Sequence, residues 1–245
     1  MTDDNVILWK IQENIGHLIL NDPPSNKMST KFFCQLKELV FNVIPNSQIK
    51  AIVIYGNGRH FSSGAEIEEL LKVIKFQAKV NKKQTINKYP TFIKDNNKIV
   101  LFLEKLRIPV IAAVRGICLG SAMELVLFCH IRICAENTVF GFPETSFNLM
   151  PGLGGTQKIL KFLKYQKALE LILKGSNFNA EEALKMKLIH KIIPKKEIIN
   201  AALHLAKSIP ENYIKEKASL YVEKYLNKKT VVRSQKSEVR SKNIY

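Results

Sequence analysis

The most informative part of the chain is its middle, which reads Pro109-Val-Ile-Ala-Ala-Val114, Arg115-Gly-Ile-Cys-Leu-Gly120 and Ser121-Ala-Met-Glu-Leu-Val-Leu-Phe128. The first segment is short and wholly apolar, which is typical of a strand buried on both faces of a sheet. The two glycines of the second segment bracket a predicted turn. The third segment is apolar on almost every side and predicts a buried helix. A buried strand followed by a buried helix indicates an α/β protein.

Segments of the same kinds lie on both sides of this stretch. Further strands are predicted at residues 6–10, 16–20, 51–55, 131–135 and 139–142. Ser29 can cap a helix whose apolar side chains recur at helical spacing as far as Val43. From Ala180 onwards the pattern is mostly helical. Because no internal repeat or long linker separates these elements, we expect one α/β domain followed by a helical tail.

Length and composition exclude several classes of protein. The 245 residues are 46% hydrophobic and 24% charged, which is ordinary for a globular chain and excludes disorder for most of its length. No uninterrupted apolar run is long enough for a membrane-spanning helix. Residues 1–5 carry acid rather than base and show no signal or transit peptide, so a cytoplasmic location is expected. The histidines and cysteines have no ligand spacing, so we expect no metal site.

The net charge of +17 is concentrated in two segments. Residues 72–98 carry +7 and residues 224–245 carry +6. They predict basic surfaces open to polyanions such as coenzyme phosphates, nucleic acid or anionic lipid, although a lysine-rich helix face is more often simply solvated. Few aromatic residues, such as Phe76 and Tyr89, interleave with the lysines of the first segment, which does not favour the base stacking of nucleic-acid binding.

Two carboxylates stand out because the local pattern does not explain them. Glu124 lies in the apolar helix predicted from Ser121, where an unpaired charge is costly. Glu144 follows Phe140-Gly-Phe-Pro143 in a stretch with few other charges. Each residue alone is more often structural. Together, and each beside a glycine-bearing loop, they predict an acid–base pair that can hold one water molecule.

Two backbone positions complement the carboxylates. Gly64-Ala65 closes a loop of small residues, and Gly120-Ser121 begins the apolar helix. A free N–H at a helix N-terminus and a second N–H from a neighbouring loop can together stabilise a developing oxyanion. The alternative interpretation is two ordinary turns.

Six segments follow one another in chain order, namely Leu20-Asn-Asp-Pro-Pro-Ser-Asn-Lys-Met28, residues 51–67, residues 109–125, Phe140-Gly-Phe-Pro-Glu144, Pro151-Gly-Leu-Gly-Gly-Thr-Gln157 and Ala180-Glu-Glu-Ala-Leu-Lys-Met-Lys-Leu-Ile-His190. Together they resemble the enoyl-CoA hydratase/isomerase (crotonase) family. In the last segment Lys187 stands where the family has glycine. Any one segment is a weak signal, but six in order are specific.

The resemblance implies roles for particular residues. The two oxyanion-hole N–H donors of the family fall on Ala65 and Ser121, and its two water-activating glutamates fall on Glu124 and Glu144. The positions that match contacts to the coenzyme or substrate are Asn26, Lys27, Ala65, Glu66, Ile67 and Gly120. No tightly bound cofactor is implied, because coenzyme A enters as part of the thioester substrate.

The resemblance also implies a crotonase-like α/β fold, in which repeated β-β-α units form two roughly perpendicular sheets wrapped by helices. We expect residues 1–190 to form the crotonase-like core. Residues 191–245 would form a helical C-terminal region with a basic tail. Residues 224–245 show no match to the family's last helical segment, so this region is expected to be truncated. Family members form trimers or hexamers, and a homo-oligomer is therefore expected.

The implied reaction is the addition of water to a 2-enoyl thioester, or its removal from a 3-hydroxyacyl thioester. The retained glutamate pair favours this over other crotonase reactions, since relatives that only isomerise or decarboxylate usually keep one carboxylate or neither. Two alternatives stay open. One is another crotonase reaction, namely isomerisation, dehydration or decarboxylation, on coenzyme A or on a carrier-protein thioester. The other is a non-catalytic homologue that binds polyanions through the basic segments.

Overall fold

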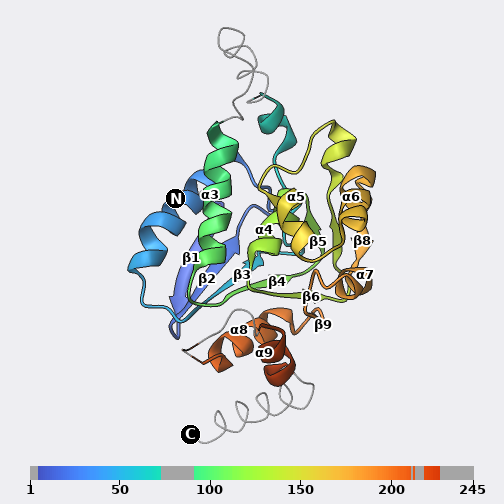
Figure 1. The fold of residues 1–245 in the computed structure, drawn as a ribbon. Coiled ribbons are helices and arrows are strands. Elements are labelled where there is room, and N and C mark those ends of the chain that lie inside the picture. Colours follow the sequence, from blue (N-terminus) through green and yellow to red (C-terminus); the bar gives the residue numbers. More distant parts are fainter. Residues whose placement is uncertain (1–4, 73–90, 211, 213–217, 227–245) are drawn as a thin grey trace, which may run out of the picture.

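The computed structural model describes residues 5–72, 91–210, 212 and 218–226, which form two β-sheets covered by helices (Figure 1). The larger sheet has the order β1-β2-β3-β4-β6-β9, and the smaller has the order β5-β7-β8. Their strands are β1 (Ile7–Gln12), β2 (Ile15–Leu20), β3 (Ala51–Gly56), β4 (Val110–Val114), β5 (Ile117–Leu119), β6 (Ile131–Ala135), β7 (Val139–Gly141), β8 (Phe178–Asn179) and β9 (Lys191–Ile193). In the larger sheet only the β1–β2 pair is antiparallel, as expected for the predicted hairpin.

The helices lie on both faces of the larger sheet (Figure 1). In chain order they are α1 (Thr30–Glu38), the π-helix Leu39–Val43, the 3₁₀ turn Ile44–Asn46, a helix at residues 67–72, α3 (Thr91–Lys105), α4 (Ser121–Phe128), the 3₁₀ helix η3 (Pro143–Phe147), α5 (Gly155–Lys158), the 3₁₀ turn Ile159–Lys161, α6 (Tyr165–Lys174), α7 (Ala180–Lys185), α8 (Ile198–Ser208) and α9 (Ala218–Tyr225). As predicted, Ser29 caps α1, because its side chain accepts a hydrogen bond from the N–H of Phe32. The predicted strands and the predicted helix at Ser121–Phe128 are likewise present.

The apolar strands are buried on both faces because alternate side chains enter two different cores. In β3, Ile52 and Ile54 pack with α1, α3 and α4, whereas Ala51 and Val53 pack with α8 and α9. The β4 strand shows the same alternation. A strand with helices on both sides has no polar face, which is why these runs read as wholly apolar in the sequence.

Successive β-β-α units connect the two sheets. In the units β4-β5-α4 and β6-β7-α5, the first strand joins the larger sheet, the second joins the smaller sheet, and a helix returns. The first unit, β1-β2-α1, keeps both strands in the larger sheet. The chain therefore has a mixed α/β crotonase fold. Within the described ranges no helix is both long and apolar enough to cross a membrane.

One local prediction was wrong. Residues 117–119, expected to be part of a turn, form the strand β5. This strand pairs with β7, and Cys118 also forms a bridge with Ser62. Both partners are distant in the chain, and the flanking glycines, from which the turn was predicted, do not indicate this pairing. The pairing matters because it places the end of β5 and the loop at residues 62–65 side by side.

The proposed division of the chain at residue 190 stays a prediction. Just beyond it, β9 pairs with β6 in the larger sheet, and α8 packs against β3 and β4. Residues 73–90 and 227–245, which make up most of the two basic segments 72–98 and 224–245, lie outside the described residues. The expected absence of a family match in residues 224–245 therefore falls mostly outside them as well.

Candidate active site

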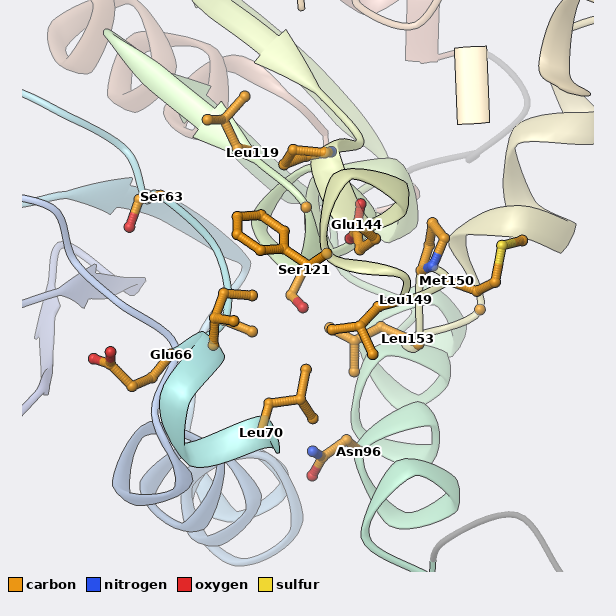
Figure 2. Close-up of a pocket in the computed structure, with 18 of the residues that line it drawn as sticks. Ser63, Glu66, Leu70, Asn96, Leu119, Ser121, Glu144, Leu149, Met150 and Leu153 are labelled. Atoms are coloured by element: carbon orange, nitrogen blue, oxygen red, sulfur yellow. The ribbon is translucent and has the colours of Figure 1, made fainter. Parts of the chain in front are cut away.

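A cavity of about 1140 Å³ lies between the helix at residues 67–72, α3, the start of α4 and the loop that follows η3 (Figure 2). Seven of the predicted site residues line it, namely Lys27, Ala65, Glu66, Ile67, Gly120, Ser121 and Glu144. The remaining wall is largely apolar and includes Leu70, Leu149 and Leu153, which Figure 2 shows around the opening. The fold therefore gathers most of the predicted residues around one cavity.

Two residues that line this cavity, Ala65 and Ser121, have backbone N–H groups without a partner in the secondary structure. Ser121 is the first residue of α4, so its N–H has no partner within the helix. Ala65 forms a parallel bridge with Met28, in which Met28 N–H donates to Gly64 O (2.9 Å) and Glu66 N–H donates to Met28 O (3.4 Å). This pattern turns the N–H of Ala65 itself away from Met28. Within the part of the chain that the structure describes, neither N–H has a hydrogen-bond acceptor.

Gly64 brings the two N–H groups together. A Cβ atom at this position would lie 2.5 Å from Leu119 O and 3.5 Å from the nitrogen of Ser121. Only glycine allows this approach, and its φ of +91° also requires the absence of a side chain. The backbone nitrogens of Ala65 and Ser121 therefore lie near one another, as an oxyanion hole requires, and that role for them stays a prediction.

Glu124 lies in the first turn of α4, and its side chain is fully buried. Three backbone N–H groups of one loop bind its carboxylate. Leu153 and Gly155 donate to Oε1 at 2.9 and 2.7 Å, and Gly152 donates to Oε2 at 3.2 Å. A Cβ atom on Gly155 would lie 2.5 Å from Cγ of Glu124, so the glycine is needed for this contact. The loop at residues 152–155 thus forms a cradle for the carboxylate.

Glu144 reaches the same region from the smaller sheet. It lies on η3 directly after β7, and 8% of it is exposed. Its Oε1 comes so close to Gly120 that a Cβ atom there would be 3.0 Å away. Its Oε2 is buried and has no hydrogen-bond partner among the described residues. Figure 2 shows Glu144 beside Ser121, so this oxygen lies next to the candidate oxyanion hole.

The environments of the two carboxyls raise both pKa values. Burial raises the pKa of Glu144 to about 7. Burial and the charge of Glu144 raise the pKa of Glu124 to about 7, against the opposing effect of the three N–H donors. Near neutral pH one carboxyl can therefore be protonated while the other is ionised, which is the state that general acid–base chemistry requires.

Two of the predicted coenzyme-contacting side chains bind one another. Lys27 Nζ and Glu66 Oε2 form an ion pair of 2.8 Å at the edge of the cavity. A third, Asn26, does not line the cavity. Its buried Nδ2 lies 2.9 to 3.1 Å from the carbonyl oxygens of Asn57, His60 and Phe61, and its Oδ1 accepts a hydrogen bond from Asp22 N–H. The Asn26 side chain thus connects two loops.

Sequence reasoning missed two parts of the site. The loop at residues 151–155 was recognised as glycine-rich, but its N–H donors to Glu124 were not predicted. The second part is Asn96 and Asn97 on α3, which also line the cavity. They lie within the lysine-rich segment 72–98, where nothing in the local sequence distinguishes them from the polar residues around them.

Known proteins resemble this chain over most of its length. The family described as enoyl-CoA hydratase/isomerase matches residues 10–244. A probable enoyl-CoA hydratase of Bacillus subtilis (strain 168) is 31% identical over 225 residues, which are 91% of this chain and 83% of the relative. The crystal structure of an enoyl-CoA hydratase from Bacillus anthracis is 26% identical with a TM-score of 0.72, over 83% of this chain and 76% of that one. An enoyl-CoA hydratase from Polaromonas sp. JS666, 22% identical with a TM-score of 0.74 over 97% and 92%, has the same fold.

Proposed function

Because the chain belongs to the enoyl-CoA hydratase/isomerase (crotonase) family, we propose that it is a hydro-lyase acting on an acyl thioester of coenzyme A. It would add water to a 2-enoyl thioester or remove water from a 3-hydroxyacyl thioester. The observation that carries this proposal is the coupled pair Glu124 and Glu144, whose pKa values are both about 7. Glu144 lines the cavity together with Ala65 and Ser121, whose N–H groups have no acceptor among the described residues, and Glu124 is buried behind the lining.

The first step would bind the thioester carbonyl in the oxyanion hole. Its oxygen accepts hydrogen bonds from the N–H groups of Ala65 and Ser121. When water adds to the β-carbon, negative charge develops on this oxygen, and the two donors stabilise it. One such donor contributes about 3 kcal/mol to lowering the barrier.

The second step would use the carboxyls. The ionised carboxyl takes a proton from the water whose oxygen bonds to the β-carbon, and the protonated carboxyl gives a proton to the α-carbon. The unpartnered Oε2 of Glu144 is the oxygen best placed to bind this water. Dehydration follows the same steps in reverse. The protons belong to the coupled pair, so the acid and the base are not assigned individually.

One observation favours a second reaction. The three N–H groups of the cradle already occupy the oxygens of Glu124, which leaves Glu144 as the carboxylate with an open position. A single carboxylate is sufficient to move a proton between the α- and γ-carbons of an enoyl thioester. Double-bond isomerisation is therefore the alternative, and Glu124→Gln distinguishes the two reactions because only hydration needs both carboxyls.

The decisive experiment follows the loss of enoyl absorbance of crotonyl-CoA with a matched pair of variants. Ser121→Pro removes the N–H at the first helical position, where proline is tolerated, whereas Ser121→Ala keeps it. We expect Ser121→Pro to lower kcat by about a hundredfold or more and Ser121→Ala to stay near wild type. Near wild-type activity of Ser121→Pro or of Glu144→Gln would refute the proposed site.

We further propose that the protein acts as a homo-oligomer, a trimer or a hexamer, in the cytoplasm. Tyr165, Leu169 and Leu173 recur every four residues along α6 and are exposed in the single chain, which supports burial against another copy. Light scattering of the wild type and of Leu173→Lys tests this. A monomeric wild type at assay concentration would contradict it.

A further inference from the structure

Asn97 on α3 contacts the loop that holds Glu124. With its amide oriented so that Nδ2 faces the loop, it donates hydrogen bonds to the carbonyl oxygens of Gly152 (2.9 Å) and Leu153 (3.1 Å). These two bonds use both protons of the amide nitrogen. The neighbouring Asn96 also lines the cavity (Figure 2), but among the described residues it has no hydrogen bond to this loop.

One of these bonds continues to the carboxylate through a single peptide group. The carbonyl oxygen of Gly152 and the N–H of Leu153 belong to the same planar peptide. That N–H donates to Oε1 of Glu124 at 2.9 Å. A donor on the carbonyl side makes the N–H of the same peptide a stronger donor, and the effect is larger in a buried environment. Asn97, the peptide and Glu124 therefore form one chain of hydrogen bonds.

We propose that Asn97 is a positioning residue, which holds the Gly152–Leu153 peptide in the orientation in which its N–H binds the Glu124 carboxylate. The loop needs such support. A Cβ atom at Gly152 would meet nothing within 4 Å, and Gly154 adopts a left-handed conformation with φ of +90°. The buried side chain of Leu153 anchors the middle of the loop, but it does not determine how the peptide before it is turned.

The charged groups near Glu124 do not prevent a measurement of how Asn97 affects the Glu124 carboxylate. Glu144 is the charged group whose field acts on Glu124. Most other described charges of the elements packed against α4 pair with one another, and Lys105 is exposed at the end of α3. Lys158 of α5 binds Glu104 of α3 at 2.6 Å, and the Lys98 and Asp95 side chains of α3 bind each other at 2.8 Å.

The test measures how Glu124 titrates when Asn97 loses its donor. In a Glu144→Gln background, Glu124 titrates without its coupled partner, and NMR of ¹³C-labelled glutamate carboxyls follows it. Asn97→Leu keeps the shape of the side chain but removes the amide. We expect the Glu124 pKa to rise by about half a pH unit, because the ionised form loses part of its stabilisation. The matched control, Asn96→Leu, is expected to leave the Glu124 titration unchanged.

An unchanged Glu124 titration in Asn97→Leu, or an equal shift in Asn96→Leu, would overturn the proposal. If Asn97→Leu fails to fold, Asn97→Ser takes its place, because a serine hydroxyl is too short to reach both carbonyls. A folded Asn97→Ser variant with an unchanged Glu124 pKa would equally refute the positioning role of Asn97.

The consequence for turnover rests on the proposed hydro-lyase function and has its own measurement. With Glu144 intact, Asn97→Leu is expected to move the acidic limb of the kcat/KM profile up by at most about half a pH unit, because the pair titrates as a unit, and so to lower the rate by up to about threefold on that limb. A general loss of folded enzyme would instead lower the rate equally at every pH and would contradict a positioning role. A shifted titration in a protein whose wild type does not hydrate crotonyl-CoA would support the positioning role and refute the proposed function.

Discussion

Replacing Glu124 with glutamine should change how the stability of the protein depends on pH. The ordinary pKa of a glutamate is 4.5, and burial together with Glu144 raises that of Glu124 to about 7 in the folded state. Between these two values the folded state keeps a proton that the unfolded state has released. Stability falls with rising pH wherever the folded state binds more protons. The wild-type protein should therefore lose stability between pH 4.5 and about 7, and no more above that.

The size of this loss follows from the shift. One pKa unit corresponds to 1.36 kcal/mol, so the raised pKa of Glu124 corresponds to about 3 kcal/mol. The side chain is fully buried, so solvent screening does not reduce the effect. Glu124→Gln cannot ionise, and its stability lacks this contribution at every pH. Its amide nitrogen would meet a backbone N–H of the cradle, which adds a constant loss of about 1 to 3 kcal/mol.

Urea unfolding of both proteins from about pH 5 to about pH 8, followed by the fluorescence of Trp9, the single tryptophan, measures the difference. We expect the wild type to lose about 2.5 kcal/mol relative to Glu124→Gln across this range, because the rest of the loss falls below pH 5. Glu136→Gln is the matched control, because Glu136 is exposed and should show no such trend. A stability difference that stays constant with pH would refute the reasoning that Glu124 is buried and protonated in the folded state.

Three further substitutions test the surroundings of the site. Gly155→Ala places a Cβ atom 2.5 Å from Cγ of Glu124, so we expect kcat for crotonyl-CoA to fall about a hundredfold, and an unchanged kcat would contradict the role of the cradle. Lys158→Met removes the closer of the two lysines that bind the nearly buried carboxylate of Glu104, at 2.6 Å against 3.4 Å for Lys161, and urea unfolding should show a loss of about 3 kcal/mol. Lys187→Gly should stabilise the protein by about 1 kcal/mol, because this exposed lysine has a φ of +56°; equal or lower stability in a thermal melt would argue against strain there.

The strands of the larger sheet were predictable because their short runs of apolar residues indicate burial on both faces. A short run such as Val110–Val114 has apolar side chains on both faces, and few other structures explain it. The strand β5 was not predictable in the same way. It has three residues, and its two partners lie 56 residues before it at Ser62 and 20 residues after it at β7, so only long-range pairing distinguishes it from a turn.

In the site, too, residues that contradict their local sequence pattern could be predicted, whereas contacts between distant segments could not. Glu124 could be identified because a charge in an apolar helix contradicts the local pattern. Lys187 could be identified because the family resemblance predicts glycine at this position. Asn26 carried no such contradiction. Its matched position suggested a coenzyme contact, whereas its side chain binds carbonyl oxygens 31 to 35 residues further along the chain. Contacts of this kind depend on how two loops meet, and the residues of one loop alone do not reveal them.

The pKa of Glu124 near 7 depends on opposing effects from different parts of the chain, in which burial and the charge of Glu144 raise it and the N–H donors of the cradle lower it. Burial in α4 alone would hold the carboxyl protonated at every physiological pH, and three N–H donors in an exposed loop would hold it ionised. Only the combination leaves the proton free to move near neutral pH. It needs an apolar helix with one glutamate and, some thirty residues later, a loop with glycines where the backbone must approach that glutamate. Finding both segments in one chain is therefore stronger support for acid–base chemistry than either carboxylate alone. Substitutions in the cradle are expected to lower the catalytic rate in a protein that still folds.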